Sequence, residues 1–285
     1  MLWVCRHFEL NLDGGGRGRV MGILNVTPDS FSDGGRFFEV DDALRQARTL
    51  VDAGADFIDV GGESTRPGAE PVEPAVELDR VLPVIRALSA SFPSVLLSVD
   101  TRRAEVARAA LRAGAQLVND ISGLQDPDMA SVVADAGCGL IVMHLRGEPR
   151  TMQSVDLSSP DIVVEVLRHL ASVLDRAAAA GVSPEAIAID PGIGFGKTVD
   201  QNAQILARLD ELAVLRRPIV IGLSRKSFLG ALTERGTDSR EHATTAAHAL
   251  ALARGAHVLR THDVGAAIDA AAVTAAILRP VGQRP

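Results

Sequence analysis

The chain has 285 residues with 29 basic and 36 acidic side chains, a net charge of −7 at pH 7, and no lysine- or arginine-rich run that would indicate a nucleic-acid-binding surface. It shows no signal peptide and no apolar run of about 18 residues, the length of a membrane span. Its two cysteines, Cys5 and Cys138, have no C-x-x-C spacing, which argues against a disulfide framework or a zinc site. From these features together we expect a soluble, cytoplasmic protein.

Residues 1–19 stand apart from the rest of the chain. Leu2, Val4 and Leu10 flank a polar stretch, and we expect a β-hairpin that turns at residues 13–16. We assign this N-terminal addition no catalytic role.

Eight short β-branched or aliphatic runs follow, and each ends in a small polar cluster. Most of them are too continuous for strands with one solvated face, so they predict strands buried on both faces, as in a parallel sheet. The runs span residues 20–24, 57–60, 95–99, 117–118, 140–143, 187–189, 219–222 and 258–259.

The long segments between these runs have helical periodicity. Before the fifth helix, Ser159 can cap and Pro160 can take the first helical position. Eight strand–helix pairs predict an α/β fold, a (β/α)8 TIM barrel of one domain over residues 1–285, since the length is close to the roughly 250 residues of that fold. Helix ends are indicated by glycines at positions 54, 114, 137, 181 and 255.

In such a barrel the site lies at the carboxyl ends of the strands, so the polar residues there are the candidates. Asp100 and Asp190 follow apolar strands and could grip a ring that carries adjacent N–H donors. They could equally form a general acid–base pair or cap the next helix, and capping is a serious alternative for Asp100.

Positive side chains follow the last two strands, where this fold usually binds phosphate. Lys226 follows the seventh strand, and Arg260 and His262 follow the eighth. Together with the two carboxylates, they suit a substrate with a donor-rich ring at one end and phosphates at the other.

Other motifs are weaker. Residues 189–198 end like a P-loop but miss its first glycine, so we expect their glycines to make room for a ligand ring. The 7 histidines show no metal-ligand spacing. A metal would therefore be a hard ion with oxygen ligands, Mg²⁺ held by Asn25 and by substrate phosphates.

Taken together, the strand-end segments closely resemble the dihydropteroate synthase family of folate biosynthesis, in order and spacing, from about residue 20 to 275. The segments are MGILNVTPDSFSDGG (21–35), GGESTRPG (61–68), SVDT (98–101), NDISG (119–123), MHLRGEPRTMQ (143–153), IDPGIGFGKT (189–198), GLSRKS (222–227) and RTHDV (260–264).

The resemblance implies transfer of a dihydropterin methylene from its diphosphate to the amine of 4-aminobenzoate, with Mg²⁺. It implies that Asn25, Arg260 and His262 hold the diphosphate, and that these residues and Lys226 are catalytic. The resemblance also implies that the pterin is bound by Asp100, Asn119, Met143, Asp190, Phe195, Gly222 and Lys226. It implies that the 4-aminobenzoate pocket, where sulfonamide drugs also bind in this family, is formed by Phe31, Thr65, Arg66, Pro67 and Ser224.

Two rival functions remain. A pterin-binding methyltransferase that moves methyl from methyltetrahydrofolate to a corrinoid protein would share the pterin-edge residues, but it would lack the loops at 25–35 and 61–68. A catalytically silent, pterin-binding paralogue would be expected to lose residues such as Lys226 and Arg260, which are present here.

The resemblance also suggests a homodimer packed through the later helices. Residues 242–255 are small and apolar on more than one side, and such a surface, if exposed, would favour association. The alternative is that this segment is buried wholly within its own barrel.

Overall fold

The computed structural model describes residues 1–12, 17–27, 36–64 and 68–278, without the side chains of 36–39. The strands are β1 (Leu2–Cys5), β2 (Phe8–Asn11), β3 (Arg19–Asn25), β4 (Phe57–Gly61), β5 (Leu96–Asp100), β6 (Leu117–Asp120), β7 (Gly139–Met143), β8 (Ile187–Asp190), β9 (Val220–Gly222) and β10 (Val258–Thr261). The helices are α1 (Arg36–Asp52), α2 (Pro74–Ser91), α3 (Ala104–Ala113), α4 (Met129–Ala136), α5 (Ile162–Ala179), α6 (Val199–Ala207), α7 (Ser227–Thr233), α8 (Glu241–Ala253) and α9 (Val264–Leu278), with short 3-10 turns at Pro184–Ala186, Leu209–Leu215 and Thr237–Ser239.

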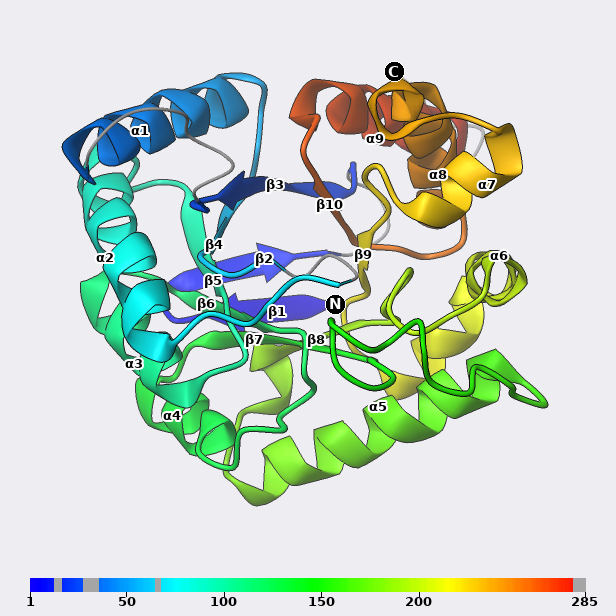
Figure 1. Ribbon diagram of the computed structural model, residues 1–285, viewed down its shortest axis with the longest axis horizontal. Helices are drawn as coiled ribbons and strands as arrows, with labels where there is room; N and C mark the ends of the chain where they lie inside the picture. The colour runs from blue at the N-terminus through cyan, green and yellow to red at the C-terminus, as the bar shows by residue number, and fades with distance from the viewer. Residues whose placement is uncertain (13–16, 28–35, 65–67, 279–285) are drawn as a thin grey trace.

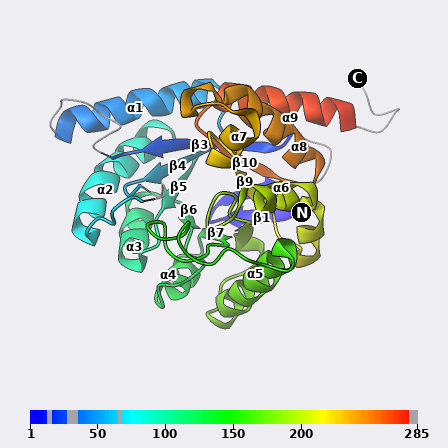
Figure 2. The same cartoon turned by 45° about the vertical axis from the view of Figure 1, so that its right-hand side comes forward.

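Strands β3 to β10 form one parallel sheet in the order β8-β7-β6-β5-β4-β3-β10-β9. A parallel bridge between Ile189 and Ile219 joins β8 to β9, and the Ile189 amide donates to the Pro218 carbonyl at 2.8 Å. The helices surround the strands as an outer ring, and α1 and α9, the first and last of them, lie along the same edge of the molecule (Figures 1 and 2). The predicted (β/α)8 barrel is confirmed.

The strands bury both faces because alternate side chains point to opposite sides. Outward side chains such as Val60 and Val142 pack against the helices in the main hydrophobic core. The inward side chains at the amino ends of the strands form a separate apolar layer inside the barrel: Met21, Phe57, Leu96, Leu117, Ile141, Ala188, Val220 and Val258.

The N-terminal hairpin covers this inner apolar layer, and it lies across the middle of the ring of helices in Figure 1. Trp3 and Cys5 are fully buried there, and the Trp3 indole N–H donates to the Ala186 carbonyl at 2.9 Å. The hairpin is confirmed, but its predicted turn at residues 13–16 is wrong. Cys5 pairs with Phe8, so the chain turns at residues 6–7, and 13–16 lie outside the described residues.

The predicted helix ends are confirmed, whereas the predicted start of α5 is wrong. All five stop glycines, at positions 54, 114, 137, 181 and 255, have positive φ. In α5, however, the cap is Asp161, whose carboxylate accepts from the Val163 and Val164 amides at 2.9 and 3.2 Å. Ser159 and Pro160 precede the helix, and Ser159 Oγ donates to Glu165 at 2.8 Å.

None of the helices in the described part of the chain is both long enough and apolar enough to cross a bilayer.

Candidate active site

Polar groups gather inside the barrel, two residues further along each strand from the inner apolar layer. The two-residue period of a strand turns these side chains to the same inner side. The positions are Ile23, Asp59, Ser98, Asn119, Met143, Asp190, Gly222 and Arg260. Five of these eight residues have side chains that are hydrogen-bond acceptors or donors, those of Asp59, Ser98, Asn119, Asp190 and Arg260. The eight positions include five of the predicted substrate-binding residues: Asn119, Met143, Asp190, Gly222 and Arg260.

Arg260 is the centre of the polar contacts among these residues. Its Nε donates to Asp59 Oδ2 at 2.7 Å and its Nη2 donates to Asp100 Oδ2 at 2.7 Å. Asn119 Nδ2 donates to the same Asp59 oxygen at 2.9 Å. The side chain of Asp59 thus ties Arg260 to Asn119 from within β4, where it is completely buried.

The alternative role of Asp100, capping the next helix, is wrong. The first amide of α3, at Ala104, donates to Asp126 at 2.8 Å instead. Asp100 faces Arg260, and burial raises the pKa of its carboxyl to about 7, an effect that Arg260 opposes and Asp59 reinforces.

Asp190 and Lys226 lie at the other side of the barrel mouth. Burial raises the pKa of Asp190, while the amide of Gly192 donates to its Oδ1 at 2.6 Å. Burial lowers the pKa of Lys226 to about 8 although Asp190 opposes that shift. The Lys226 ammonium lies 4.0 Å from the centroid of the Phe195 ring, a cation–π contact.

Next to these charged groups lie a buried apolar cluster and an open space at Gly222. A side-chain carbon added at Gly222 would meet no heavy atom within 4 Å, so the wall of the barrel is open there. The apolar cluster consists of Ile121, Met143, Leu145, Met152 and Phe195. Met143, Phe195 and Gly222, predicted from the resemblance to line a slot for a flat ring, are thus placed at one mouth.

The remaining phosphate-side residues also lie at this end of the barrel. Ser224 Oγ is hydrogen-bonded to His262 Nδ1 at 2.9 Å and accepts from the His262 amide at 3.2 Å. Asn25 ends β3 opposite Gly61, and a carbon added at Gly61 would lie 3.7 Å from both the Asn25 and the Asp100 side-chain oxygens.

Two of the three glycines of residues 191–197, Gly192 and Gly196, have a different purpose from the predicted one. A side-chain carbon at Gly192 would lie 1.9 Å from the His144 carbonyl oxygen, and one at Gly196 would lie 2.6 Å from the Arg146 side chain. Both glycines also have positive φ. They make room for the protein's own chain after β7, not for a ligand ring.

Four predicted residues of the 4-aminobenzoate pocket, Phe31, Thr65, Arg66 and Pro67, lie outside the described residues. Their roles stay predictions, and of that pocket only Ser224 is placed.

Two residues that contact the site were missed by the sequence reasoning. Asp59 had a usable signal, because an acidic residue in the middle of an apolar strand has to have a partner. Lys197 had no comparable signal. It follows the glycine-rich loop, and only the folded chain shows that it is buried with its ammonium against three carbonyls.

The donor set around Asn25 fits a hard cation that substrate phosphates help to hold. The amide oxygen of Asn25 lies at the mouth beside the Asp100 carboxylate, and both are ligand types that Mg²⁺ accepts. The described residues contain no cluster of three or more His, Cys, Asp or Glu side chains that could hold a metal by themselves.

The model of the pterin binding enzyme family matches residues 21–262, from within β3 to just after β10. A dihydropteroate synthase from Synechocystis is 46% identical over 270 residues, covering 94% of this chain and 92% of the relative. The chain belongs to the dihydropteroate synthase family.

Solved structures of this family have the same fold. Dihydropteroate synthase from Yersinia pestis, solved with a sulfonamide drug complex, is 42% identical with a TM-score of 0.90 and covers 97% of this chain and 99% of that chain. The Xanthomonas albilineans enzyme with 4-aminobenzoic acid is 44% identical with a TM-score of 0.90, covering 98% and 99%. This dihydropteroate synthase family member is therefore similar in sequence and in fold to proteins solved with these ligands.

Proposed function

We propose that the protein condenses a 7,8-dihydropterin bearing a 6-methylene diphosphate with 4-aminobenzoate, giving 7,8-dihydropteroate and pyrophosphate. The observation that carries this proposal is the mouth of the barrel, where the Asp190 carboxylate faces the Lys226 ammonium and that ammonium lies over the Phe195 ring, in a chain of the dihydropteroate synthase family. The enzyme is a transferase.

The pterin fits the mouth edge-on. Its 2-amino-pyrimidinone edge presents N–H donors, which suit the acceptor-only carboxylate of Asp190, and the ammonium of Lys226 can donate to ring acceptors. Met143 and Phe195 supply the apolar walls for the flat ring. Asp100 and Asn119 complete the polar edge through their contacts with Arg260 and Asp59.

The diphosphate belongs at the ends of β3 and β10. Two nitrogens of Arg260 are engaged by Asp59 and Asp100, so Nη1 is the nitrogen that would donate to a phosphate oxygen. His262 and Asn25 would act from either side. Asn25 would also hold Mg²⁺, and that ion would neutralise charge on the departing diphosphate.

The reaction is a substitution at the methylene carbon. The carbon–oxygen bond to diphosphate breaks with its electron pair leaving on pyrophosphate, the aniline nitrogen forms the new carbon–nitrogen bond, and that nitrogen then loses a proton to solvent. The electron-rich pterin can bear cationic character at the methylene, so no dedicated base is needed. Positioning and charge stabilisation by the protein supply the rate enhancement.

The 4-aminobenzoate pocket would be formed by Ser224 together with Phe31, Thr65, Arg66 and Pro67. Ser224 lies at the mouth beside His262, which would place the amine next to the phosphate side of the pterin. The same pocket is proposed to bind sulfonamides.

A homodimer packed through α8 and α9 is the second part of the proposal. Leu250 of α8 and Val273, Ile277 and Leu278 of α9 are 57–67% exposed, although large apolar side chains favour burial. Light scattering at micromolar concentration tests it, and a monomer only would contradict it. One domain over residues 1–285 and a cytoplasmic location stay predictions.

Release of pyrophosphate in a steady-state assay tests the activity. We expect release only when the pterin diphosphate and 4-aminobenzoate are both present. Pterin binding without release would favour the catalytically silent paralogue. Methyl transfer from methyltetrahydrofolate to a corrinoid protein would favour the methyltransferase instead.

A further inference from the structure

Residues 191–197, which connect β8 to the start of α6, carry much of the pterin site but have little backbone support of their own. The segment includes Phe195, whose ring lies under the Lys226 ammonium. It also includes Gly192, whose amide donates to the Asp190 carboxylate. Between its own residues, the backbone bond is from the Phe195 amide to the Gly192 carbonyl, at 3.1 Å. Side-chain hydrogen bonds must therefore fix its shape.

Lys197 is the side chain that makes the most of these contacts. Its ammonium donates to the carbonyls of Gly192 at 2.8 Å, Phe195 at 3.0 Å and His144 at 3.3 Å. The first two carbonyls belong to the segment itself and the third to the end of β7. One side chain thus folds the segment onto itself and fastens it to the neighbouring strand.

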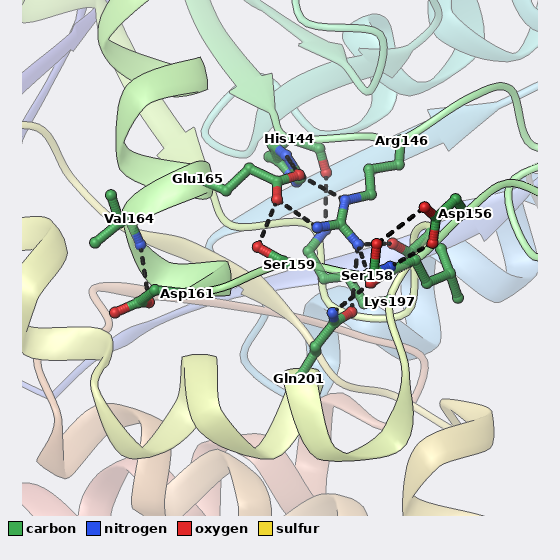
Figure 3. Close-up of polar contacts among 12 residues, drawn as sticks. His144, Arg146, Asp156, Ser158, Ser159, Asp161, Val164, Glu165, Lys197 and Gln201 are labelled. Atoms are coloured by element: carbon green, nitrogen blue, oxygen red, sulfur yellow. Dashed lines mark hydrogen bonds and ion pairs between the residues drawn. The ribbon is translucent and has the colours of Figure 1, made fainter.

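A second group of side chains fixes the far end of the segment. Arg146 Nη1 donates to the Gly196 carbonyl at 3.4 Å, and its Nε donates to Glu165 at 2.6 Å. Figure 3 shows the Arg146 guanidinium between Glu165 of α5 and Gln201 of α6. Asn202 accepts from the Gly194 amide at 2.7 Å.

The buried position of Lys197 rules out direct contact with a substrate. The residue is 3% exposed, and three carbonyls take its three N–H donors. A compact ammonium suits three converging carbonyls better than a planar guanidinium does. Burial lowers the pKa of Lys197 to about 7, an effect that Asp190 and Glu165 oppose and that Arg146 and Lys226 reinforce.

We propose that Lys197 is a positioning residue for the pterin: its ammonium shapes residues 191–197 so that Phe195 and the carboxylate of Asp190 meet the ring in the right geometry. This inference rests on the proposed function. Lys197 touches no reacting atom, so it acts on pterin affinity through the segment that it holds.

The test compares two isosteric substitutions in the full chain. Lys197→Met keeps the length of the side chain and removes its three donors. Gln116→Met is the matched control, because Gln116 is also a buried side chain that is hydrogen-bonded to backbone, its Oε1 accepting from the Leu97 amide at 2.8 Å, but it lies at the amino end of the barrel. Binding of pterin-6-carboxylate is measured by calorimetry, and melting temperature is measured alongside.

We expect Lys197→Met to weaken pterin binding about tenfold or more, the loss that follows when a hydrogen-bonding charged group is removed. The Michaelis constant for the pterin diphosphate should rise with it, while kcat should fall much less. A residue that only stabilised the fold would lower the active fraction, and hence kcat, with the Michaelis constant unchanged. Gln116→Met should lose melting temperature but keep pterin affinity within about twofold, since distant sites act independently.

Equal pterin affinity in Lys197→Met and wild type would overturn the inference, and so would an equal loss of affinity in Gln116→Met. If Lys197→Met does not fold, Lys197→Gln, which keeps a shorter donor, replaces it with the same expected direction. Wild-type protein that bound no pterin would instead contradict the proposed function.

Discussion

Asp190 has two partners at once, which makes it the most informative single residue of the site. One carboxylate oxygen accepts from the Gly192 amide at 2.6 Å, and the carboxylate also faces the ammonium of Lys226. The first contact orders residues 191–197, and the second belongs to the pterin mouth. A substitution can separate these roles because an amide keeps an acceptor oxygen but introduces a donor.

We expect Asp190→Asn to lose about 2 to 4 kcal/mol of pterin binding, because its amide would turn a donor toward the donors of the ring. Calorimetry with a pterin analogue measures this. Asp120→Asn is the control: Asp120 is also buried and accepts from the Ser122 and Leu124 amides at 2.8 Å, but it points away from the barrel interior. Unchanged pterin affinity in Asp190→Asn would mean that Asp190 does not bind the pterin and serves only to accept the hydrogen bond from the Gly192 amide.

Arg260 offers a second test at this scale, because it compensates two carboxylates where water is scarce. Arg260→Met leaves Asp59 and Asp100 without their cation, and should lower the free energy of unfolding by about 3 to 5 kcal/mol. Arg150→Met removes a pair with Glu70 in which both side chains are at least 60% exposed, and should cost less than about 1 kcal/mol. Urea denaturation of both variants checks this, and equal losses would refute a compensating role for Arg260.

At the scale of whole elements, α2 and the start of α3 hold the base of the loop at residues 61–68. Arg103, just before α3, donates to Glu63, to Glu77 of α2 and to the Val72 carbonyl at 2.6 Å. Glu77 is completely buried, and burial raises its pKa. Because Glu63 lies two residues before Thr65, the first of the proposed 4-aminobenzoate residues in this loop, these contacts should control that pocket and not the pterin mouth.

We therefore expect Arg103→Met to raise the Michaelis constant for 4-aminobenzoate by roughly tenfold, equivalent to about 1.4 kcal/mol, with pterin affinity unchanged. The exposed Arg108 of α3 provides the control, and Arg108→Met should change neither value. Initial-rate kinetics with each substrate varied in turn distinguish the two. A matching loss of pterin affinity would mean that Arg103 supports the barrel as a whole.

For the molecule as a whole, buried neutral histidines link stability to pH. His248 on the inner side of α8 is 1% exposed, and burial lowers its pKa from 6.5 to about 4. Neither ring nitrogen has a hydrogen-bond partner among the described residues. Between pH 6.5 and 4 the unfolded chain binds a proton at this histidine and the folded protein does not, so this residue makes stability fall as pH falls.

The variant His248→Leu has no group at this position that can bind a proton in the unfolded chain. Its free energy of unfolding should therefore decline less steeply than that of the wild type between pH 6.5 and 4, by about 1.4 kcal/mol per pH unit. Urea denaturation at several pH values measures the difference between the two proteins. Parallel curves would show that His248 also stays neutral when the chain is unfolded, or that it is protonated in both states.

The sequence alone determined the barrel and most of its mouth. Continuous apolar runs, helical periodicity and stop glycines are local signals, because each depends on the backbone and on neighbours within a few residues. The carboxyl-end rule then placed Asp100, Asn119, Asp190, Lys226 and Arg260 at one end without any contact being known.

The tertiary structure alone decided which groups meet. Asp59 pairs with Arg260 across 201 positions of sequence, and Lys197 reaches His144 across 53. The cap of α5 was predicted wrongly because Ser159 and Asp161 both have capping side chains two residues apart, and Asp161 accepts from the first amides. The hairpin turn was predicted wrongly because its residues, Arg6 and His7, include none of the usual turn residues. Partners of buried charges depend on which chain segments pack together, and that information is absent from any short stretch of sequence.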